Sequence, residues 1–201
     1  MKKSPRSISV ALLLIAVALL CGNCGSKQAR YYMLSSTSGP GRASSSAGPI
    51  TVGVDPVDLP DYLRRPEIVT RPGDSAVKFA EFDRWAEPLE ETVLRVLAEE
   101  LSGLLPGANI LVFPWSRATQ LDYRISVDIK IFGLQPDGKV HLTANWRVLG
   151  GKGGTLSSEE TSLAAEVAGE GYGAIVSAMD VTLARLSEAI ALSLPDRNGN
   201  E

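Results

Sequence analysis

The sequence predicts an α+β fold, in which an antiparallel β-sheet packs against two amphipathic helices in a single domain. Three observations predict it. Two long segments alternate between apolar and polar residues, two others repeat apolar residues at helical spacing, and short turn motifs separate them. The apolar content of 44% is ordinary for a chain with a packed core. We find no internal repeat, so the chain beyond its leader suits one domain.

Short strands are expected in the first half of the chain. Four segments have strand-like composition: residues 30–34, 50–54, 68–71 and 76–80. Between the last two lies Pro72-Gly73-Asp74, where Pro fixes φ and Gly supplies a left-handed position, so these two strands should form a hairpin. Residues 35–48 are rich in Ser and Gly without a hydrophobic period, which predicts a loop.

A first helix is expected to open at Glu87, with Pro88 at the first helical position, where its missing N–H costs nothing. Pro106-Gly107 ends it. The apolar stripe consists of Leu89, Val93, Val96, Leu97, Leu101, Leu104 and Leu105. Charged residues are expected on the outer face: Glu90, Glu91, Arg95, Glu99 and Glu100. Residues 110–113 should form a short strand.

Two long strands follow, joined by a turn at Pro136-Asp137-Gly138. The first places on one face Tyr123, Ile125, Val127, Ile129 and Ile131, and the second runs over 140–148. Such alternation is typical of antiparallel strands with one buried and one solvated face. A glycine-rich turn leads to a last strand near 156–165. The final helix, about 172–192, carries its stripe on Tyr172, Val176, Met179, Leu183, Leu186 and Ile190.

The N-terminal segment has the pattern of a secretory signal. Lys2, Lys3 and Arg6 precede an apolar run at 8–20 of about thirteen residues, shorter than the roughly twenty that a membrane-spanning helix needs. Cysteines stand at its end, where bacterial lipoproteins are acylated. We favour Cys24, since a polar tether follows it, with Cys21 as the alternative. An ordinary cleaved signal or an uncleaved inner-membrane anchor are the other interpretations.

The expected organisation is therefore a lipoprotein signal at 1–23, a tether at 24–29, a folded domain at 30–195 and a polar tail at 196–201. Three acyl chains on Cys24 would anchor the protein permanently, because stable anchoring already needs only two lipid signals. Both cysteines lie in the signal region, so the folded part should contain neither a disulfide nor a thiol nucleophile.

The charge balance excludes one class of partner. The whole chain carries a formal charge of −3, and removal of three positive residues with the signal leaves −6. An acidic domain lacks the basic face that nucleic acid requires. By the same argument it should not adhere to anionic headgroups, so the membrane link is expected to be the lipid alone.

Residues that could carry chemistry are few. His141 is the single histidine, on the polar face of a strand, so neither a zinc site nor a Ser-His-Asp triad has enough members. The run of glycines at 150–154 lacks the Gly-Lys-Ser/Thr ending of a phosphate loop and is interpreted as a turn. The pairs Glu90-Glu91 and Glu159-Glu160 are interpreted as solvated. We expect no cofactor, no metal and no catalytic residue.

The segment from Asp61 to Pro66 is the candidate binding site. Tyr62, Leu63, Arg64 and Arg65 are residue types that anchor protein contacts, and Trp85 is a further candidate. The structural alternative is that Tyr62 and Leu63 fill the core, while the arginines cap helix carbonyls or pair with Glu67 and Asp61. For Trp85, next to the first helix, a core role is the favoured interpretation.

An ordered series of motifs gives the chain its resemblance to a family. These are residues 52–71, Arg84-Trp85-Ala86-Glu87-Pro88-Leu89, Phe113-Pro114-Trp115 and the closing residues 186–190. Together they resemble the PqiC/YmbA family of ABC-type transport auxiliary lipoproteins, over nearly all of the mature chain. The family tends to place its lipid cysteine a few residues before an aromatic strand similar to residues 31–34, which favours Cys24.

The resemblance implies a periplasm-facing lipoprotein, on the outer membrane, that works with an MCE-domain (PqiB-like) protein and an inner-membrane permease or ABC transporter. Such systems are thought to move phospholipid or other hydrophobic molecules between the membranes. The resemblance further implies a homo-oligomeric ring, and no catalytic residues to carry over. Two rival functions are a monomeric periplasmic carrier that holds one lipid, and a periplasmic hydrolase whose activity would depend on His141.

Overall fold

The computed structural model describes residues 28–37, 50–116 and 118–194. The signal segment, Cys21, Cys24, most of the predicted tether and the polar tail lie outside the described residues. Along the chain, the elements are β1 (Arg30–Tyr32), β2 (Thr51–Val54), the 3-10 helix η1 (Asp61–Leu63), β3 (Glu67–Gly73), β4 (Ala76–Trp85), α2 (Leu89–Leu104), β5 (Asn109–Val112), β6 (Tyr123–Leu134), β7 (Lys139–Gly150), β8 (Thr155–Glu166) and α3 (Gly171–Leu192).

The strands form two sheets. The larger has the order β5-β2-β6-β7-β8, and the smaller has the order β1-β4-β3. Pairing is parallel between β2 and both of its neighbours and between β1 and β4, and antiparallel elsewhere. The α+β class and the two helices are thus confirmed, but the sheet expected to be single and antiparallel is two mixed sheets. The parallel pairs join strands distant in sequence, as parallel connections require.

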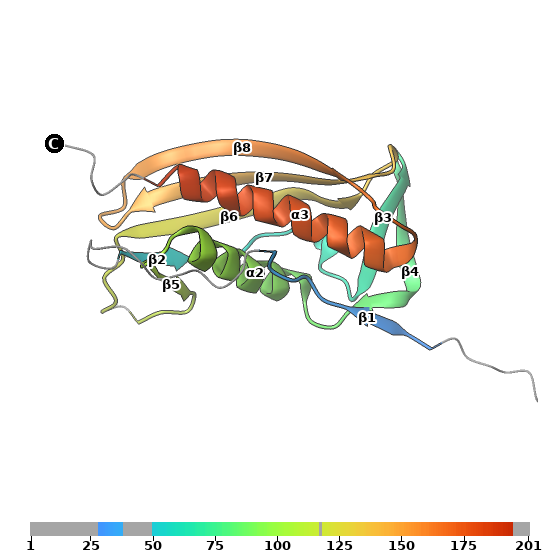
Figure 1. Ribbon diagram of the computed structural model, residues 1–201, viewed down its shortest axis with the longest axis horizontal. Coiled ribbons are helices and arrows are strands. Elements are labelled where there is room, and N and C mark those ends of the chain that lie inside the picture. The colour runs from blue at the N-terminus through green and yellow to red at the C-terminus, as the bar shows by residue number, and fades with distance from the viewer. Residues whose placement is uncertain (1–27, 38–49, 117, 195–201) are drawn as a thin grey trace, which may run out of the picture.

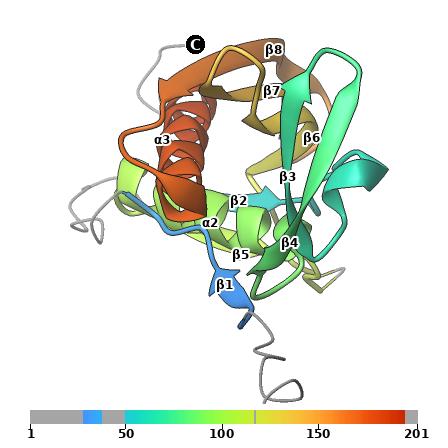
Figure 2. The same cartoon turned by 90° about the vertical axis from the view of Figure 1, so that its right-hand side faces the viewer.

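Both helices lie on one face of the five-stranded sheet, side by side, and the smaller sheet closes one end of the molecule (Figures 1 and 2). The core fills the space between these layers, where the predicted stripes of α2 and α3 meet the inward faces of β6 and β7. Its fully buried side chains include Leu97, Leu101, Leu183, Ile125 and Trp146. Within the described ranges, no helix has the length and apolar character needed to cross a bilayer.

The alternation predicted for β6 is correct as far as Ile129 and wrong beyond it. The register of β6 against β7 shifts between Ile129 and Ile131, so Lys130 is an extra residue of a β-bulge. Beyond the bulge, the side chains that face the core are therefore those of the even-numbered residues. Phe132 is therefore buried in the core, while Ile131, expected on the inward face, is only half-buried.

Helix α2 begins one residue later than predicted, at Leu89 rather than at Pro88. Pro88 precedes the first helical residue, and its carbonyl oxygen accepts hydrogen bonds from the N–H groups of Glu91 and Thr92, both at 3.1 Å. Proline suits this position because its carbonyl oxygen accepts hydrogen bonds, while it has no backbone N–H that would need an acceptor. The helix ends where Pro106-Gly107 predicted.

The glycine-rich segment between β7 and β8 is the predicted turn, and one of its residues must be glycine. The Gly151 N–H donates to the Asp122 carbonyl oxygen over 2.8 Å. A Cβ at this position would lie only 2.0 Å from the carbonyl oxygen of Leu121. Gly151 therefore permits a close approach of two backbone segments.

Candidate functional site

The segment between β2 and β3 carries most of the predicted binding residues and is firmly attached to the large sheet. The Asp58 N–H donates to Val127 at 3.0 Å, and its carbonyl oxygen accepts from Ile129 at 2.9 Å. Leu63 is buried in the core, and Tyr62 packs against the core with part of its ring exposed. Burial raises the pKa of the Tyr62 phenol, which keeps it neutral.

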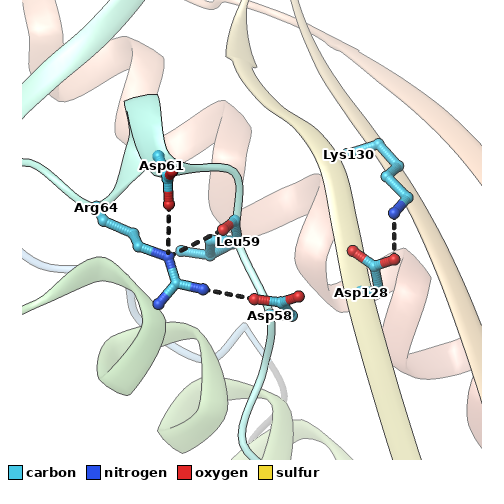
Figure 3. A network of polar contacts seen from close by, with 6 residues as sticks. All are labelled: Asp58, Leu59, Asp61, Arg64, Asp128 and Lys130. Carbon is cyan, nitrogen blue, oxygen red and sulfur yellow. Dashed lines mark hydrogen bonds and ion pairs between the residues drawn. The ribbon is translucent and has the colours of Figure 1, made fainter.

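Arg64 closes this segment onto itself (Figure 3). Its guanidinium makes an ion pair with Asp58 at 2.5 Å, donates from Nε to the Leu59 carbonyl oxygen at 3.0 Å, and lies 3.8 Å from Asp61. Nearby on β6, Lys130 pairs with Asp128. The side chain of Arg64 remains partly exposed, so it can also meet a partner.

Arg65 connects the same segment to the hairpin of β3 and β4. Its Nε lies 3.4 Å from Glu67 Oε2, and its guanidinium lies 4.5 Å from the ring centroid of Phe79. Glu67 also pairs with Arg84 at 3.5 Å. A cation–π contact at such an exposed site contributes about 0.5–1 kcal/mol, which holds the guanidinium in place without removing it from solvent.

Trp85, the fifth predicted residue, lies in the core with 6% of its surface exposed, and its backbone N–H donates to the Pro66 carbonyl oxygen at 2.7 Å. The structural alternative thus holds for Leu63, for Trp85, and for the pairs Arg64–Asp61 and Arg65–Glu67. What the structure presents at the surface is two ordered guanidinium groups beside a partly exposed tyrosine. Both groups already contact carboxylates, so an acidic partner would share or displace these contacts.

His141 is not part of this segment and lies on β7, close to the turn that joins β6 to β7. Its Nε2 lies 2.7 Å from Asp137 Oδ2. The pKa of Asp137 is lowered, first by the hydrogen bond from the Lys139 N–H and then by His141. Among the described residues, no cluster of three or more His, Cys, Asp and Glu side chains is arranged to hold a metal ion.

One buried carboxylate was not predicted from the sequence. Asp83 of β4 is buried, pairs with Arg30 Nε at 2.7 Å and accepts a hydrogen bond from the Tyr32 hydroxyl at 2.8 Å. Burial alone would raise its pKa, but the hydrogen bonds from Arg30 and Tyr32 lower it overall. These contacts fasten β1 to β4. They join residues more than fifty positions apart in the sequence, so no local sequence pattern predicts them.

A second unexpected pair lies where residues 34–37 cross the two helices. Glu100 was expected on the solvated face of α2, but it is buried, because Thr37 covers it and donates to its Oε1 from the backbone N–H at 2.5 Å. Asp180 of α3 accepts from the Ser35 N–H at 2.9 Å. Burial, aided by the charge of Glu100, raises the pKa of Asp180 to about 6.

The raised pKa of Asp180 predicts a pH-dependent stability. A carboxyl with a higher pKa in the folded state stabilises the fold below its unfolded pKa, near 4, and this stabilisation is lost as pH rises through about 6. Asp180→Asn keeps an acceptor for Ser35 without the charge. We expect it to raise the free energy of unfolding by about 1 kcal/mol at pH 7.5, where Asp180 is charged, and to have no such effect at pH 4, where Asp180 is protonated. The expected gain is only this large because solvent screens a half-buried group.

Urea unfolding at several pH values measures this difference. Glu188→Gln is the matched control, since it removes an exposed carboxyl from the same helix. Equal pH dependence of stability in wild type and Asp180→Asn would contradict the assignment.

An open apolar groove of about 460 Å³ runs beside α2, next to the edge strand β5. Its walls include Leu94, Ala98 and Val112, with Glu91, Arg95 and Ser102 at its margins. The groove was not predicted from the sequence, because Leu94 falls outside the predicted apolar stripe.

Comparison with known proteins gives a consistent picture. Residues 32–191 match the family described as ABC-type transport auxiliary lipoprotein component. The intermembrane transport lipoprotein PqiC of Escherichia coli is 29% identical over 136 residues, which cover 67% of this chain and 71% of the relative. The PqiC of Shigella flexneri matches to the same extent.

Solved structures share the fold. An uncharacterised protein, 22% identical, superposes with a TM-score of 0.72 over 84% of this chain and 100% of its own. A protein from Xanthomonas campestris, 17% identical, superposes with a TM-score of 0.61 over 81% of this chain and 93% of its own. At these identities the likeness concerns the fold alone.

Proposed function

The chain belongs to the ABC-type transport auxiliary lipoprotein component family, and from this membership we propose that it is a lipid-anchored, non-enzymatic docking subunit of an MCE-type transport system. The family match carries the proposal, because it spans residues 32–191 and thus both sheets and both helices. The family is one of transport auxiliary lipoproteins and not an enzyme family.

In this proposal, acyl chains on Cys24 (or on Cys21) hold the domain at the periplasmic face of the outer membrane. The domain, in a homo-oligomeric ring, receives the end of a PqiB-like MCE protein whose partner permease lies in the inner membrane. The cargo is phospholipid or another hydrophobic molecule. The name of the Escherichia coli relative, an intermembrane transport lipoprotein, supports this reading.

We assign the partner contact to the surface formed by Tyr62, Arg64 and Arg65. Its ordering supports the assignment, since Arg64 is fixed by Asp58 and Leu59 and Arg65 by Glu67 and Phe79. Groups ordered before binding lose less entropy when a partner arrives. The buried Leu63 and Trp85 would serve this surface by supporting it from below.

Replacing both guanidinium groups tests the assignment. We expect Arg64→Glu with Arg65→Glu to leave a folded protein that no longer captures the MCE protein from detergent-solubilised membranes. Arg64→Glu also sets a third carboxylate beside Asp58 and Asp61, whereas Arg65→Glu adds one beside Glu67 only, so the single Arg65→Glu variant disturbs fewer contacts. It should weaken capture about tenfold or more, as loss of a central arginine at an interface does.

The matched control is Arg147→Glu with Lys152→Glu, which changes the charge equally at exposed positions of β7 and of the turn after it. Circular dichroism must show the same fold in all variants. Undiminished capture of the MCE protein by the Arg64→Glu/Arg65→Glu variant would refute the contact surface. Loss of capture in the control variant would show that the change in net charge, and not the position of the arginines, weakens binding.

The apolar groove beside α2 favours a second candidate function, that of a monomeric periplasmic carrier that holds one lipid. Its volume of about 460 Å³ is of the size that small-molecule sites occupy. Native mass spectrometry of the purified protein separates the two, since a carrier retains a stoichiometric lipid and a docking subunit does not.

A further inference from the structure

A hollow of about 730 Å³ lies where β6 begins and β7 ends, at the end of the molecule away from β1 (Figure 1). Two sequence motifs that the partner contact leaves unused border it. Trp115 of the Phe113-Pro114-Trp115 motif lines one side, and the glycine-rich turn after β7 lines the other. A hollow of this volume is within the range of small-molecule sites.

The floor of the hollow is the face of the large sheet that the helices leave uncovered. Gly53, Arg124 and Leu149 lie directly opposite one another on β2, β6 and β7. Their chain neighbours Val54 and Ile125 are buried in the core. Because successive side chains of a strand point to opposite faces, Arg124 and Leu149 point away from the helices.

Trp115 and Leu121 form an apolar wall that is packed onto β2. A Cβ at Gly53 would lie only 2.7 Å from Leu121 Cδ1 and 3.1 Å from Trp115 Cη2, so glycine makes room for both side chains. Phe113 holds the indole of Trp115 in an edge-to-face contact, with the ring centroids 5.3 Å apart. Together with Leu149, this wall offers an ordered apolar surface to a ligand.

Arg124 is held from one edge of its guanidinium only. Its Nε lies 2.8 Å from both carboxylate oxygens of Asp55, which is buried beside it. The two terminal nitrogens of Arg124 form no hydrogen bond within the part of the chain that the structure describes, and 51% of its side chain is exposed. A guanidinium held in this way presents a planar pair of donors, which suits a phosphate.

Asp122 supplies the opposite charge at a short distance. It stands two residues before Arg124, so about 7 Å of extended chain separates their Cα atoms. One of its carboxylate oxygens accepts from the Thr51 N–H at 2.8 Å, and the other makes no hydrogen bond to any described residue. Asp55 balances Arg124, and Lys152 on the turn balances Asp122. The hollow is therefore neutral overall, with a cation and a carboxylate presented side by side.

We infer that this hollow binds the headgroup of a zwitterionic phospholipid of the phosphatidylethanolamine type. The phosphate accepts hydrogen bonds from the terminal nitrogens of Arg124, and the primary ammonium, one ethylene link away, donates to Asp122. The glycerol and the first methylene groups pack on Trp115, Leu121 and Leu149. A neutral site of this kind disfavours an anionic headgroup, which would leave Asp122 without a cation.

The inference rests on the proposed function, since it names the class of lipid that the docking subunit would contact. The hollow is open to solvent, so the contact is transient and agrees with a subunit that retains no lipid on purification. It shares no residue with the surface of Tyr62, Arg64 and Arg65, so lipid contact and partner contact can be tested separately.

Titration of the full acylated chain, in a neutral detergent, with dihexanoyl phosphatidylethanolamine tests the inference. The NMR signals of the indole N–H groups report binding at the site. We expect the Trp115 signal to shift until it saturates, while the signals of the buried Trp85 and Trp146 stay in place. Dihexanoyl phosphatidylglycerol should bind about tenfold more weakly, as the loss of one hydrogen bond between charged groups predicts.

Two variants separate the roles of the charged groups. Asp122→Asn keeps an oxygen acceptor for β2 and should lower the affinity for phosphatidylethanolamine to that for phosphatidylglycerol. Arg124→Lys keeps a cation for the buried Asp55 and should weaken both lipids about tenfold, because lysine lacks the planar pair of donors. The matched controls are Asp74→Asn and Arg185→Lys, which make the same changes at exposed positions of the β3–β4 turn and of α3 and should bind as the wild type does.

A Trp115 signal that does not move, or that responds equally to both lipids, overturns the inference. Binding of free phosphoethanolamine as tight as that of the lipid would assign the hollow to a soluble ligand and would also overturn it. Capture of the MCE protein is measured on the same preparation. Capture without lipid binding overturns this inference and spares the docking proposal, and lipid binding without capture does the reverse.

Discussion

Cys24→Ser is expected to abolish incorporation of labelled palmitate into the protein and to leave its N-terminus without acyl chains. In the proposed anchor, the Cys24 sulfur is the attachment point of the lipid, and serine lacks this sulfur. The consequence for anchoring is large, because each buried CH₂ contributes about 0.8 kcal/mol and three chains bury several tens of them. Metabolic labelling followed by mass spectrometry of the N-terminal peptide measures both quantities.

Cys21→Ser is the matched control, since it makes the same change three residues earlier. It should retain full palmitate incorporation. Loss of label in Cys21→Ser and its persistence in Cys24→Ser would move the anchor to Cys21. An unmodified N-terminus in the wild type would remove the membrane anchor, and with it the docking proposal.

The parts of the fold that were predictable from sequence are those specified by neighbours along the chain. The stripe of α3 and the alternation of β7 depend only on which residues recur at intervals of three to four or of two. Both match the structure closely. The bulge at Lys130 was not predictable, because it depends on how β6 meets β7.

Pairing between distant segments was the part that sequence could not supply. Nothing in residues 51–54 distinguishes a strand that will pair in parallel with β5 and β6 from one that will form a hairpin. Glu100 shows the same limit at the level of one side chain. Its position on α2 predicts exposure, and only the crossing of residues 34–37 buries it.

In the candidate site, too, the local contacts were predictable from the sequence and the long-range contacts were not. The pairs Arg64–Asp61 and Arg65–Glu67 join residues two or three positions apart, and sequence proximity was enough to suggest them. The stacking of Arg65 on Phe79 depends on the return of the hairpin and could not be anticipated. Placement of Trp85 in the core likewise depends on how the small sheet packs in the domain, which no local pattern specifies.

Leu183→Ala is expected to lower the free energy of unfolding by about 3 kcal/mol, since it removes a large side chain from the core and leaves a cavity that the surroundings fill only in part. Leu183 is 0% exposed on the inward face of α3, where the helix layer meets the sheet. A domain of this size typically has a total stability of about 5–15 kcal/mol, so the loss is a substantial share. Urea unfolding of the purified domain, followed by circular dichroism, measures it.

Leu192→Ala makes the same chemical change on the same helix and is the matched control. Leu192 is 87% exposed at the end of α3, so its replacement should change stability by no more than about 0.5 kcal/mol. The contrast isolates burial, because side-chain volume and chemistry are identical at the two positions. Comparable losses at both would mean that α3 does not pack on the sheet through the face that carries Leu183.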